Sequence, residues 1–208
     1  MALTQFSKHT DDLLLWRLFR EGNEDAYCEL SQRYYPKLIH YGQKFTPNVQ
    51  LVEDALQDLL VHLWVYRRTL NETPSVRFYL LKAFRHQLFK ALRKYPQRAE
   101  PGDYGDDRYL EFDERYVEFS TEDVYIQQES DSDFKSKVAE RLSQLPVRQR
   151  EVIYLRFFQG LSIDEIADLL TIRPQSVSNI IQRALANLRE NWPIALLLVL
   201  LFTGLTSS

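Results

Sequence analysis

The sequence has little of the chemistry that builds disulfide, metal or redox sites. It contains one cysteine, Cys28, among 208 residues, which excludes an internal disulfide framework and a multi-cysteine zinc site. One thiol in a chain of this size is consistent with a reducing cytoplasm. The four histidines are scattered without the close pairing of metal ligands, at positions His9, His40, His62 and His86. We therefore expect no metal, no cofactor and no catalytic histidine.

Long apolar runs and strand patterns are missing as well. The apolar run at residues 194–202 is shorter than the roughly 20 residues that span a membrane. Near the start, charged residues precede any apolar segment: Lys8, His9, Asp11 and Asp12. We therefore expect no secretory signal and a cytoplasmic protein. No segment alternates apolar and polar residues as a strand does, and no repeat has a solenoid period. The expected fold class is all-α.

The charge is divided unevenly along the chain, although the net charge is only -3. Residues 1–95 carry 14 basic and 10 acidic side chains, residues 96–134 carry 3 and 13, and residues 135–208 carry 9 and 6. The acidic block also contains Pro96, Pro101, Gly102 and Gly105 and has no helical period, which predicts a partly disordered linker. We expect two small helical bundles, at residues 1–95 and 135–192, joined by this linker and followed by an apolar tail at 193–208.

The second bundle contains the pattern of a helix-turn-helix. Ser162 and Glu165 have the spacing of a capping box, which satisfies free N–H groups where a helix begins. One side of that helix is apolar, at Ile163, Ile166, Ala167 and Leu170. The period breaks after Leu170, and Pro174 suits the first position of a second helix. Two short helices joined by such a turn are the common device for reading DNA in the major groove.

The second helix of this motif separates an apolar side from a polar side. The apolar positions are Val177, Ile180, Ile181, Ala184 and Leu188. Opposite them lie donors and acceptors of the kind that meet base edges and phosphates: Gln175, Ser176, Ser178, Asn179, Gln182 and Arg183. The alternative is a three-helix module with an ordinary polar surface. The coincidence of cap, turn and period favours DNA binding.

The first bundle reads as four helices, at about residues 13–19, 24–45, 49–68 and 76–95. The third has the most regular buried side, formed by Val52, Ala55, Leu56, Leu59, Leu60 and Leu63. Its opposite side presents Asp54, Gln57, Asp58 and Val61, again at helical spacing. We call these four residues the acidic face. A basic partner helix could dock there, but any soluble helix has a charged outer side, so the pattern alone favours an ordinary solvated surface.

The fourth helix carries a row of basic side chains, Lys82, His86, Lys90 and Arg93, which we call the basic stripe. Arg77 and Arg85 lie nearby in the sequence, with Phe78, Tyr79 and Phe89 among them. Cations neutralise phosphates and aromatic rings stack on unpaired bases, so the mixture suits an opened DNA strand. The other explanation is structural, because cations are favoured near a helix C-terminus and some of the aromatic rings belong to the core.

Two segments of the chain resemble conserved regions of bacterial RNA polymerase sigma factors. The second region is matched by VEDALQDLLVHLW at residues 52–64 and VRFYLLKAFRHQLFKALRK at residues 76–94, and the fourth region by residues 145–190. The order of the segments, with an acidic linker where the third region is absent, is similar to the short sigma factors of the extracytoplasmic-function group. The resemblance implies a factor that binds core RNA polymerase, directs it to promoters and assists melting, with an anti-sigma factor as a further candidate partner.

The resemblance also assigns roles to the surfaces found above. Core RNA polymerase would be bound by the acidic face: Asp54, Gln57, Asp58 and Val61. Residues 71–75 would lie near a flipped base of the minus-10 element. The full set of minus-10 candidates is Asn71, Thr73, Arg77, Tyr79, Lys82, Arg85, His86, Lys90 and Arg93. The minus-35 candidates are Arg173, Gln175, Ser176, Ser178, Asn179, Gln182 and Arg183.

The sequence departs from the family's usual pattern at several of these positions. Tyr79 replaces a common tryptophan, His86 a common asparagine and Lys90 a common aspartate. Ser178 and Ile180 stand where basic residues are frequent in the recognition helix. The promoter sequence is therefore left open, and the second bundle alone is expected to bind DNA weakly and with strong salt dependence.

The sequence leaves alternatives open for the function of the chain and for the role of its apolar tail. The chain could be a stand-alone helix-turn-helix regulator that never enters the polymerase, or an enzyme with a DNA-binding appendage. The second is disfavoured because no nucleophile–base pair or phosphate loop is found, so we expect no enzyme. The apolar tail could pack as a final helix, contact a membrane or be buried by an inhibitory partner, and the first of these is favoured.

Overall fold

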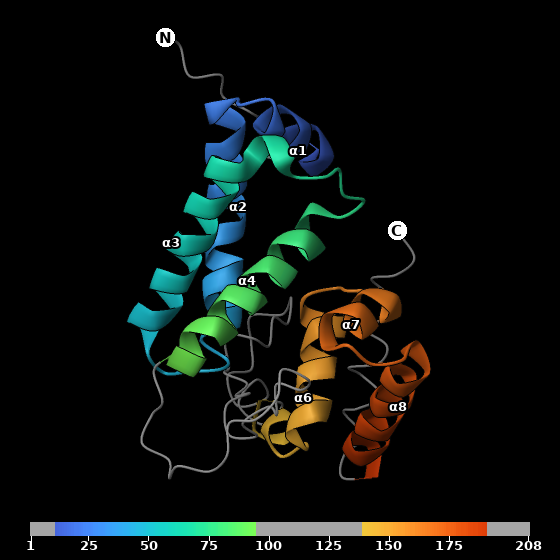
Figure 1. The fold of residues 1–208 in the computed structure, drawn as a ribbon. Helices are drawn as coiled ribbons and strands as arrows, with labels where there is room; N and C mark the ends of the chain where they lie inside the picture. The colour runs from blue at the N-terminus through green and yellow to red at the C-terminus, as the bar shows by residue number, and fades with distance from the viewer. Residues whose placement is uncertain (1–10, 95–138, 191–208) are drawn as a thin grey trace, which may run out of the picture. The chain divides into compact units, whose positions relative to one another are not determined.

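The computed structural model describes residues 11–94 and 139–190, which belong to two compact units, Met1–Leu110 and Glu111–Ser208 (Figure 1). The predicted acidic linker and apolar tail lie outside the described residues. The regular elements in both described ranges are helical, which confirms the all-α class with two helical bundles. The division between the units falls inside the segment predicted to be the linker.

Within residues 11–94, the first unit contains four α-helices and a short 3-10 helix. They are α1 (Asp12–Arg20), α2 (Glu24–Gly42), α3 (Val49–Tyr66), η1 (Arg67–Thr69) and α4 (Val76–Lys94). Side-chain oxygens begin the first three helices: Asp11 accepts from the N–H of Leu13, Asn23 from Ala26 and Asn48 from Leu51. The helix expected at 24–45 ends earlier, at Gly42.

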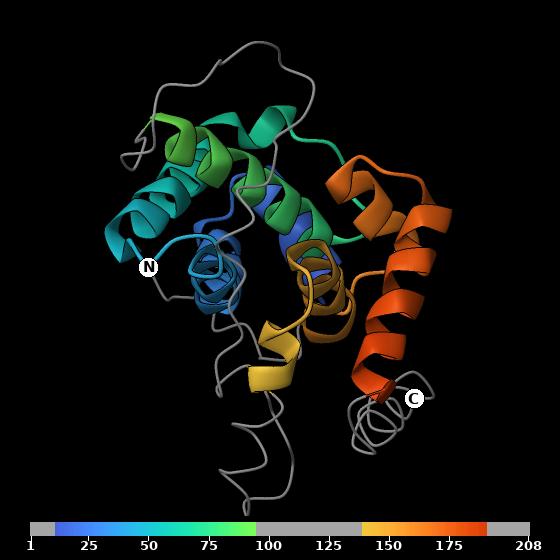
Figure 2. The same cartoon turned by 90° about the horizontal axis from the view of Figure 1, so that it is seen from below.

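The core of this unit is formed where α2, α3 and α4 meet, with α1 packed against α2 and η1 (Figures 1 and 2). The predicted apolar side of α3 is buried, apart from a half-buried Leu60. At the α1 end, aromatic rings pack in succession, from Trp16 to Phe19 at 5.4 Å, Phe19 to Tyr27 at 5.5 Å and Tyr27 to Trp64 at 5.0 Å between centroids. Ring contacts of this kind stabilise the fold by more than the burial of their apolar area alone would.

One glycine sets how closely the helices approach. A Cβ atom placed on Gly42 would lie 2.5 Å from Cγ1 of Val52 and 3.1 Å from Cζ of Phe84. Real Cβ atoms do not come this near to another carbon, so the contact of α2 with α3 and α4 requires a residue without a side chain.

The second unit holds α6 (Val147–Ile153), η2 (Tyr154–Phe158), α7 (Ile163–Leu170) and α8 (Pro174–Glu190), preceded by helical residues 139–143. The capping box at Ser162 forms as predicted, with both reciprocal hydrogen bonds to Glu165. Thr171 ends α7 with φ 54° and ψ 43°, a left-handed conformation that costs a β-branched residue free energy. The helix-turn-helix therefore contains a strained turn between its two helices.

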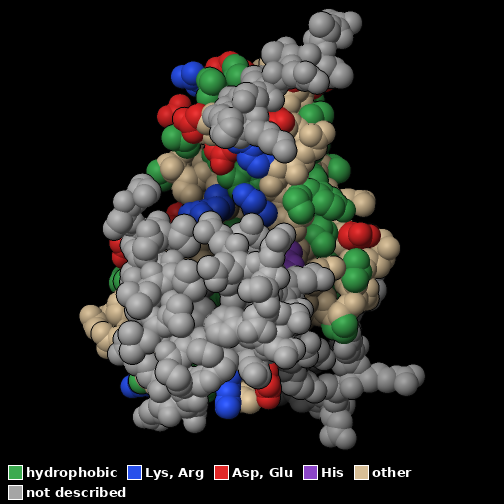
Figure 3. All heavy atoms as spheres, turned by 180° about the vertical axis from the view of Figure 1, so that it is seen from behind, with side chains coloured by type: hydrophobic (Ala, Val, Ile, Leu, Met, Phe, Trp, Pro, Cys, Tyr) green, Lys and Arg blue, Asp and Glu red, His purple; other side chains and the backbone are tan. Residues whose placement is uncertain are grey.

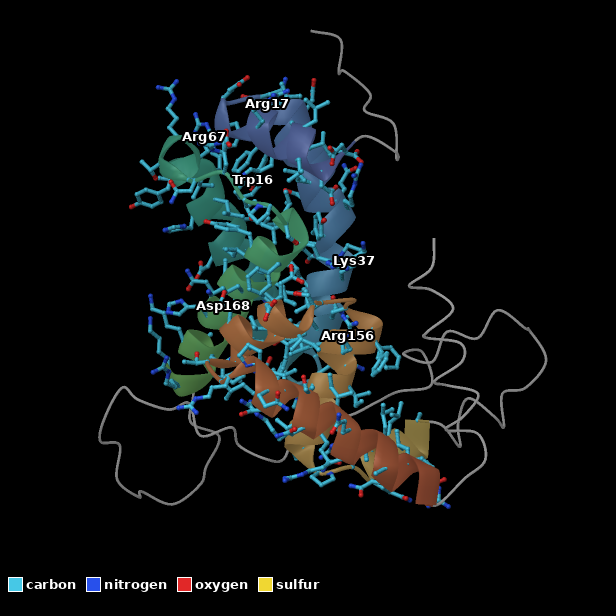
Figure 4. All side chains as sticks on the ribbon, turned by 90° about the vertical axis from the view of Figure 1, so that its right-hand side faces the viewer. Trp16, Arg17, Lys37, Arg67, Arg156 and Asp168 are labelled. Carbon is cyan, nitrogen blue, oxygen red and sulfur yellow. The ribbon has the colours of Figure 1, made fainter. Side chains whose placement is uncertain are left out.

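Arginine side chains of this unit bind the backbone on both sides of α7. Arg156 (labelled in Figure 4) belongs to η2, a π-helical turn, and donates to the carbonyl of Leu161 at 2.8 Å. Arg148 donates to the carbonyl of Leu170 at 3.4 Å. Arg148 also pairs at 3.0 Å with Glu151, whose side chain is 1% exposed. Arg148 therefore supplies part of the charge that compensates this buried carboxylate.

We expect Gly42→Ala to destabilise the first unit. Alanine favours a helix over glycine by about 1 kcal/mol, but overpacking costs about 1–3 kcal/mol and the new methyl group would meet Val52 and Phe84. The free energy of unfolding, measured by chemical denaturation, should fall by about 1–2 kcal/mol. Gln43→Ala, at the exposed neighbouring position, is the control, and Val52→Ala should recover part of the loss in the double variant. Unchanged stability of Gly42→Ala would contradict the close approach.

Candidate functional site

The acidic face of α3 lies at the surface, as its spacing predicted. Asp54, Gln57 and Asp58 are exposed, and Val61 is 63% exposed. Asp54 accepts a hydrogen bond from the amide of Gln50 at 2.8 Å, one turn earlier. The two carboxylates and the amide are therefore presented outward by a helix whose other side is held in the core.

The exposed side of α3 extends further than the sequence predicted. Val65 is 59% and Tyr66 50% exposed, and the ring of Tyr66 lies 4.5 Å from that of His62. Seen from behind, the molecule shows hydrophobic side chains beside Lys and Arg (Figure 3). Apolar side chains exposed next to charged ones favour a surface that binds a partner. The i+4 step from Val61 to Val65 is the sequence signal that would have found this extension.

The segment at residues 70–75, here called the 70–75 loop, joins η1 to α4 and is shaped by its own hydroxyl groups. Ser75 accepts the N–H of Phe78 at 3.2 Å and so begins α4. Thr73 accepts the N–H of Ser75 at 3.2 Å and donates to its carbonyl at 3.1 Å. Thr73 is half-buried, whereas the side chain of Asn71 is exposed. An amide at this position can donate to and accept from the edge of a base.

The basic stripe of α4 is exposed along its whole length, at Lys82, His86, Lys90 and Arg93. The ammonium group of Lys82 lies 5.7 Å from the centre of the Phe78 ring. Four positions that follow one side of a helix, with an aromatic ring beside the first, form a surface that suits a nucleic-acid strand.

Besides the half-buried Thr73, three of the predicted minus-10 residues lie at least partly inside the unit. The Arg85 side chain is buried, with 8% of the residue exposed, and its guanidinium carbon lies 4.3 Å from the centre of the Phe89 ring. Tyr79 is half-buried 4.9 Å from the ring of Trp16, and burial raises the pKa of its phenol. Arg77 is half-buried near Tyr34, whose pKa is raised by burial and by its hydrogen bond to Asp12, while the charge of Arg77 partly offsets the rise.

The recognition helix α8 presents most of its predicted residues. Arg173, Gln175, Asn179, Gln182 and Arg183 are exposed, and Ser176 and Ser178 are half-buried.

Three of these residues form hydrogen bonds within their own helix, α8. The Gln175 amide donates to the side-chain oxygen of Asn179 at 3.1 Å, and the hydroxyl of Ser178 donates to the carbonyl of Pro174 at 3.3 Å. Gln175 and Asn179 therefore present one joined set of donors and acceptors, whereas Ser178 is directed to its own backbone.

Residues 11–94 and 139–190 contain no group of three or more histidine, cysteine or acidic side chains placed to hold a metal ion. Within the same ranges, every helix is too short or too polar to cross a bilayer.

Comparison with protein families gives two matches, in the order that the sequence predicted. The family model for sigma-70 region 2 matches residues 30–98, and that for sigma-70 region 4 matches residues 135–188. The first contains the acidic face, the 70–75 loop and the basic stripe. The second contains the helix-turn-helix.

Curated relatives are similar over most of their length. The ECF RNA polymerase sigma factor RpoE of Cereibacter sphaeroides is 25% identical over 91% of this chain and 99% of that protein. SigX of Bacillus subtilis, also an ECF sigma factor, is 26% identical over 81% of this chain and 84% of its own. The RNA polymerase sigma factor CarQ of Myxococcus xanthus is 26% identical over 83% and 92%.

Solved structures share the fold. CnrH in complex with the cytosolic domain of CnrY has a TM-score of 0.54 at 22% identity, over 86% of this chain and 95% of that one. The sigma factor RpoE of Bartonella quintana, in complex with the anti-sigma factor NepR, has a TM-score of 0.50 at 17% identity, over 78% and 95%.

The inward placement of Arg85 leads to a test of stability. Arg85→Met keeps an aliphatic stem but removes the charge over Phe89, an interaction worth up to about 2 kcal/mol when desolvated. We expect chemical denaturation to show a loss of about 1–2 kcal/mol. Lys82→Met, the matched change on the exposed stripe, should leave stability nearly unchanged. Equal stabilities for the two variants would place Arg85 with the surface cations instead.

Proposed function

The chain belongs to the sigma-70 family of RNA polymerase sigma factors, in its extracytoplasmic-function group, and on that premise we propose which of its surfaces bind the polymerase and the promoter. The observation that carries the proposal is the pairing, within one compact unit, of an outward acidic face on α3 with an exposed basic stripe on α4. A module that only binds DNA does not need an outward acidic face.

We propose that α3 binds core RNA polymerase. Asp54, Gln57 and Asp58 would supply charge and hydrogen bonds, and Val61 an apolar contact at the centre of the interface. Val65 and Tyr66, exposed on the same helix, would extend the apolar part. An exposed acidic surface with apolar side chains beside it fits a partner helix that carries basic side chains.

The 70–75 loop and the basic stripe are proposed to hold the minus-10 element. Asn71 and Thr73 would meet an unstacked base, while Lys82, His86, Lys90 and Arg93 would follow the strand's phosphates. Arg77, Tyr79 and Arg85 are half-buried or buried, so their contribution would be to fix α4 for these contacts. Extruding a base costs a few kcal/mol, which these contacts must offset.

The helix α8 is proposed to read the minus-35 element in the major groove. Gln175 and Asn179 would contact bases as one hydrogen-bonded pair, with Ser176 and Gln182 beside them. Arg173 and Arg183 are assigned to phosphates, and Ser178 to the backbone of its own helix.

An anti-sigma factor and a cytoplasmic location complete the proposal. One of the structurally similar proteins, RpoE of Bartonella quintana, was solved with the anti-sigma factor NepR, which supports a partner of that class here. Core polymerase and promoter DNA are themselves cytoplasmic partners. The chain would act by binding and not as an enzyme.

We expect Asp54→Lys with Asp58→Lys to abolish retention of core RNA polymerase in a pull-down. The two changes reverse the charge of the acidic face while leaving the buried side of α3 intact. Loss of buried or partly buried charge contacts costs about 2–5 kcal/mol, which corresponds to at least about a 30-fold weaker complex.

The control for that pull-down carries the same change in net charge elsewhere. Glu21→Lys with Glu24→Lys alters two exposed acids at the α1–α2 turn and should leave core binding within about twofold. A wild-type protein that does not retain core polymerase would favour the stand-alone regulator.

Substitutions on α8 should separate base contacts from phosphate contacts. Arg183→Ala is expected to weaken binding to all promoters alike and to lower the salt dependence, because it removes one phosphate contact. Gln175→Ala and Asn179→Ala should change base preference, and the double variant should lose less than the sum because the two amides are bonded to each other. Selection from a library randomised across the minus-35 element measures this. Identical preference profiles for all variants would contradict the division of roles.

A further inference from the structure

Two side chains of α1 bind consecutive backbone carbonyls of the 70–75 loop. The indole N–H of Trp16 donates to the carbonyl of Asn71 at 3.1 Å, and Nε of Arg20 donates to the carbonyl of Leu70 at 2.8 Å. Figure 4 labels Trp16 below Arg17, on the α1 side of the unit. The donors are one helical turn apart on α1, so a single helix face holds two successive peptide groups of the loop.

The same two residues contact the elements on either side. The ring of Trp16 lies 4.9 Å from that of Tyr79, in the first turn of α4. Arg20 lies 3.5 Å from the carboxylate of Glu72, but the Glu72 side chain is 86% exposed and this pair adds little. Trp16 is itself almost fully buried among Phe19 and Tyr79. The position of the loop is therefore set by α1 as well as by Thr73 and Ser75.

This arrangement turns the carbonyls of Leu70 and Asn71 toward α1, while part of the loop keeps its side chains at the surface. Asn71 and Pro74 are exposed while Leu70 is buried. A site that must recognise one base needs its contact groups held within about 0.5 Å, and a loop achieves this only when its backbone is hydrogen-bonded to rigid elements. Here the rigid element is α1.

We propose that Trp16 and Arg20 are positioning residues that fix the backbone of the 70–75 loop and thereby determine which unstacked base the loop accepts from opened promoter DNA. The inference rests on the proposed function, in which Asn71 and Thr73 meet that base. Loss of either donor frees a carbonyl without removing any side chain that faces DNA. Phosphate contacts by the basic stripe remain, so base selectivity should fall while overall DNA binding changes little.

The test uses full-length protein assembled with core RNA polymerase and a promoter library randomised across the minus-10 element, with the transcripts sequenced. The variants are Trp16→Phe, which keeps a ring but removes the donor, and Arg20→Met, which keeps the stem. The preference for the favoured base at one position should fall about fivefold in each, the effect of one hydrogen bond. Arg20→Lys, which restores a charged donor, should recover part of the preference.

Matched controls separate positioning from loss of stability. Phe45→Leu replaces another buried aromatic ring of the same unit, one that packs against Tyr41 and Phe89. Arg17→Met removes an exposed cation one turn before Arg20. Both should keep the wild-type profile of base preference, even where Phe45→Leu lowers the melting temperature.

The outcomes separate the positioning role of Trp16 and Arg20 from the proposed role of the 70–75 loop in binding a base. If Asn71→Ala and Thr73→Ala flatten the preference but Trp16→Phe and Arg20→Met do not, the positioning role is wrong and the loop's role stands. If Phe45→Leu flattens it as much as Trp16→Phe, the effect is one of stability and the inference is again overturned. A wild-type profile with no preference in the minus-10 element would overturn both.

Discussion

The close approach of three helices at Gly42 is the constraint on which the first unit depends. A side chain there would meet Val52 of α3 and Phe84 of α4, so both helices turn these residues toward α2. Successive residues are about 100° apart around a helix, and fixing one residue inward fixes the direction of every other. Asp54 and Asp58 must then face away from Val52, and the basic stripe away from Phe84. One packing contact thus decides where both proposed interfaces of the unit lie.

Within each unit, arginine side chains fix the backbone beside a proposed DNA-reading element. Arg20 binds the carbonyl of Leu70 before α4, Arg156 that of Leu161 before α7, and Arg148 that of Leu170 before the strained turn at Thr171. A charged donor forms a stronger hydrogen bond with a carbonyl than a neutral one does. Turns that would otherwise be held only by their own short-range bonds are thereby tied to neighbouring helices. The strain at Thr171 can persist because such contacts surround it.

The helices and their buried sides could be predicted from the sequence because an apolar period of 3.6 residues leaves a regular trace, as at Val52, Ala55 and Leu59. The burial of Arg85 was harder to predict, although its position in the helical period indicated it. It lies four residues after Leu81 and three before Leu88, on the buried side of α4, but its residue type suggested the surface. The contacts of Trp16 with Asn71 could not be predicted at all, since they join residues 55 positions apart and leave no periodic trace. A left-handed Thr171 was equally hidden, because glycine is the usual residue there.

These internal roles of arginine reduce the number of cations that are free to bind DNA phosphates. Arginines bound to carbonyls or buried over a ring, such as Arg20 and Arg85, do not add to the cations that meet phosphates. In the part of α8 whose side chains are described, Arg183 is the exposed cation, joined by Arg173 just before the helix. Each neutralised phosphate adds to affinity through counterion release, so the second unit alone gains little. The two units belong to one chain, however, and binding of one raises the effective concentration of the other at the same DNA. Weak contacts at two promoter elements then become selective only when both elements are present on the same DNA, which is the property that promoter recognition requires.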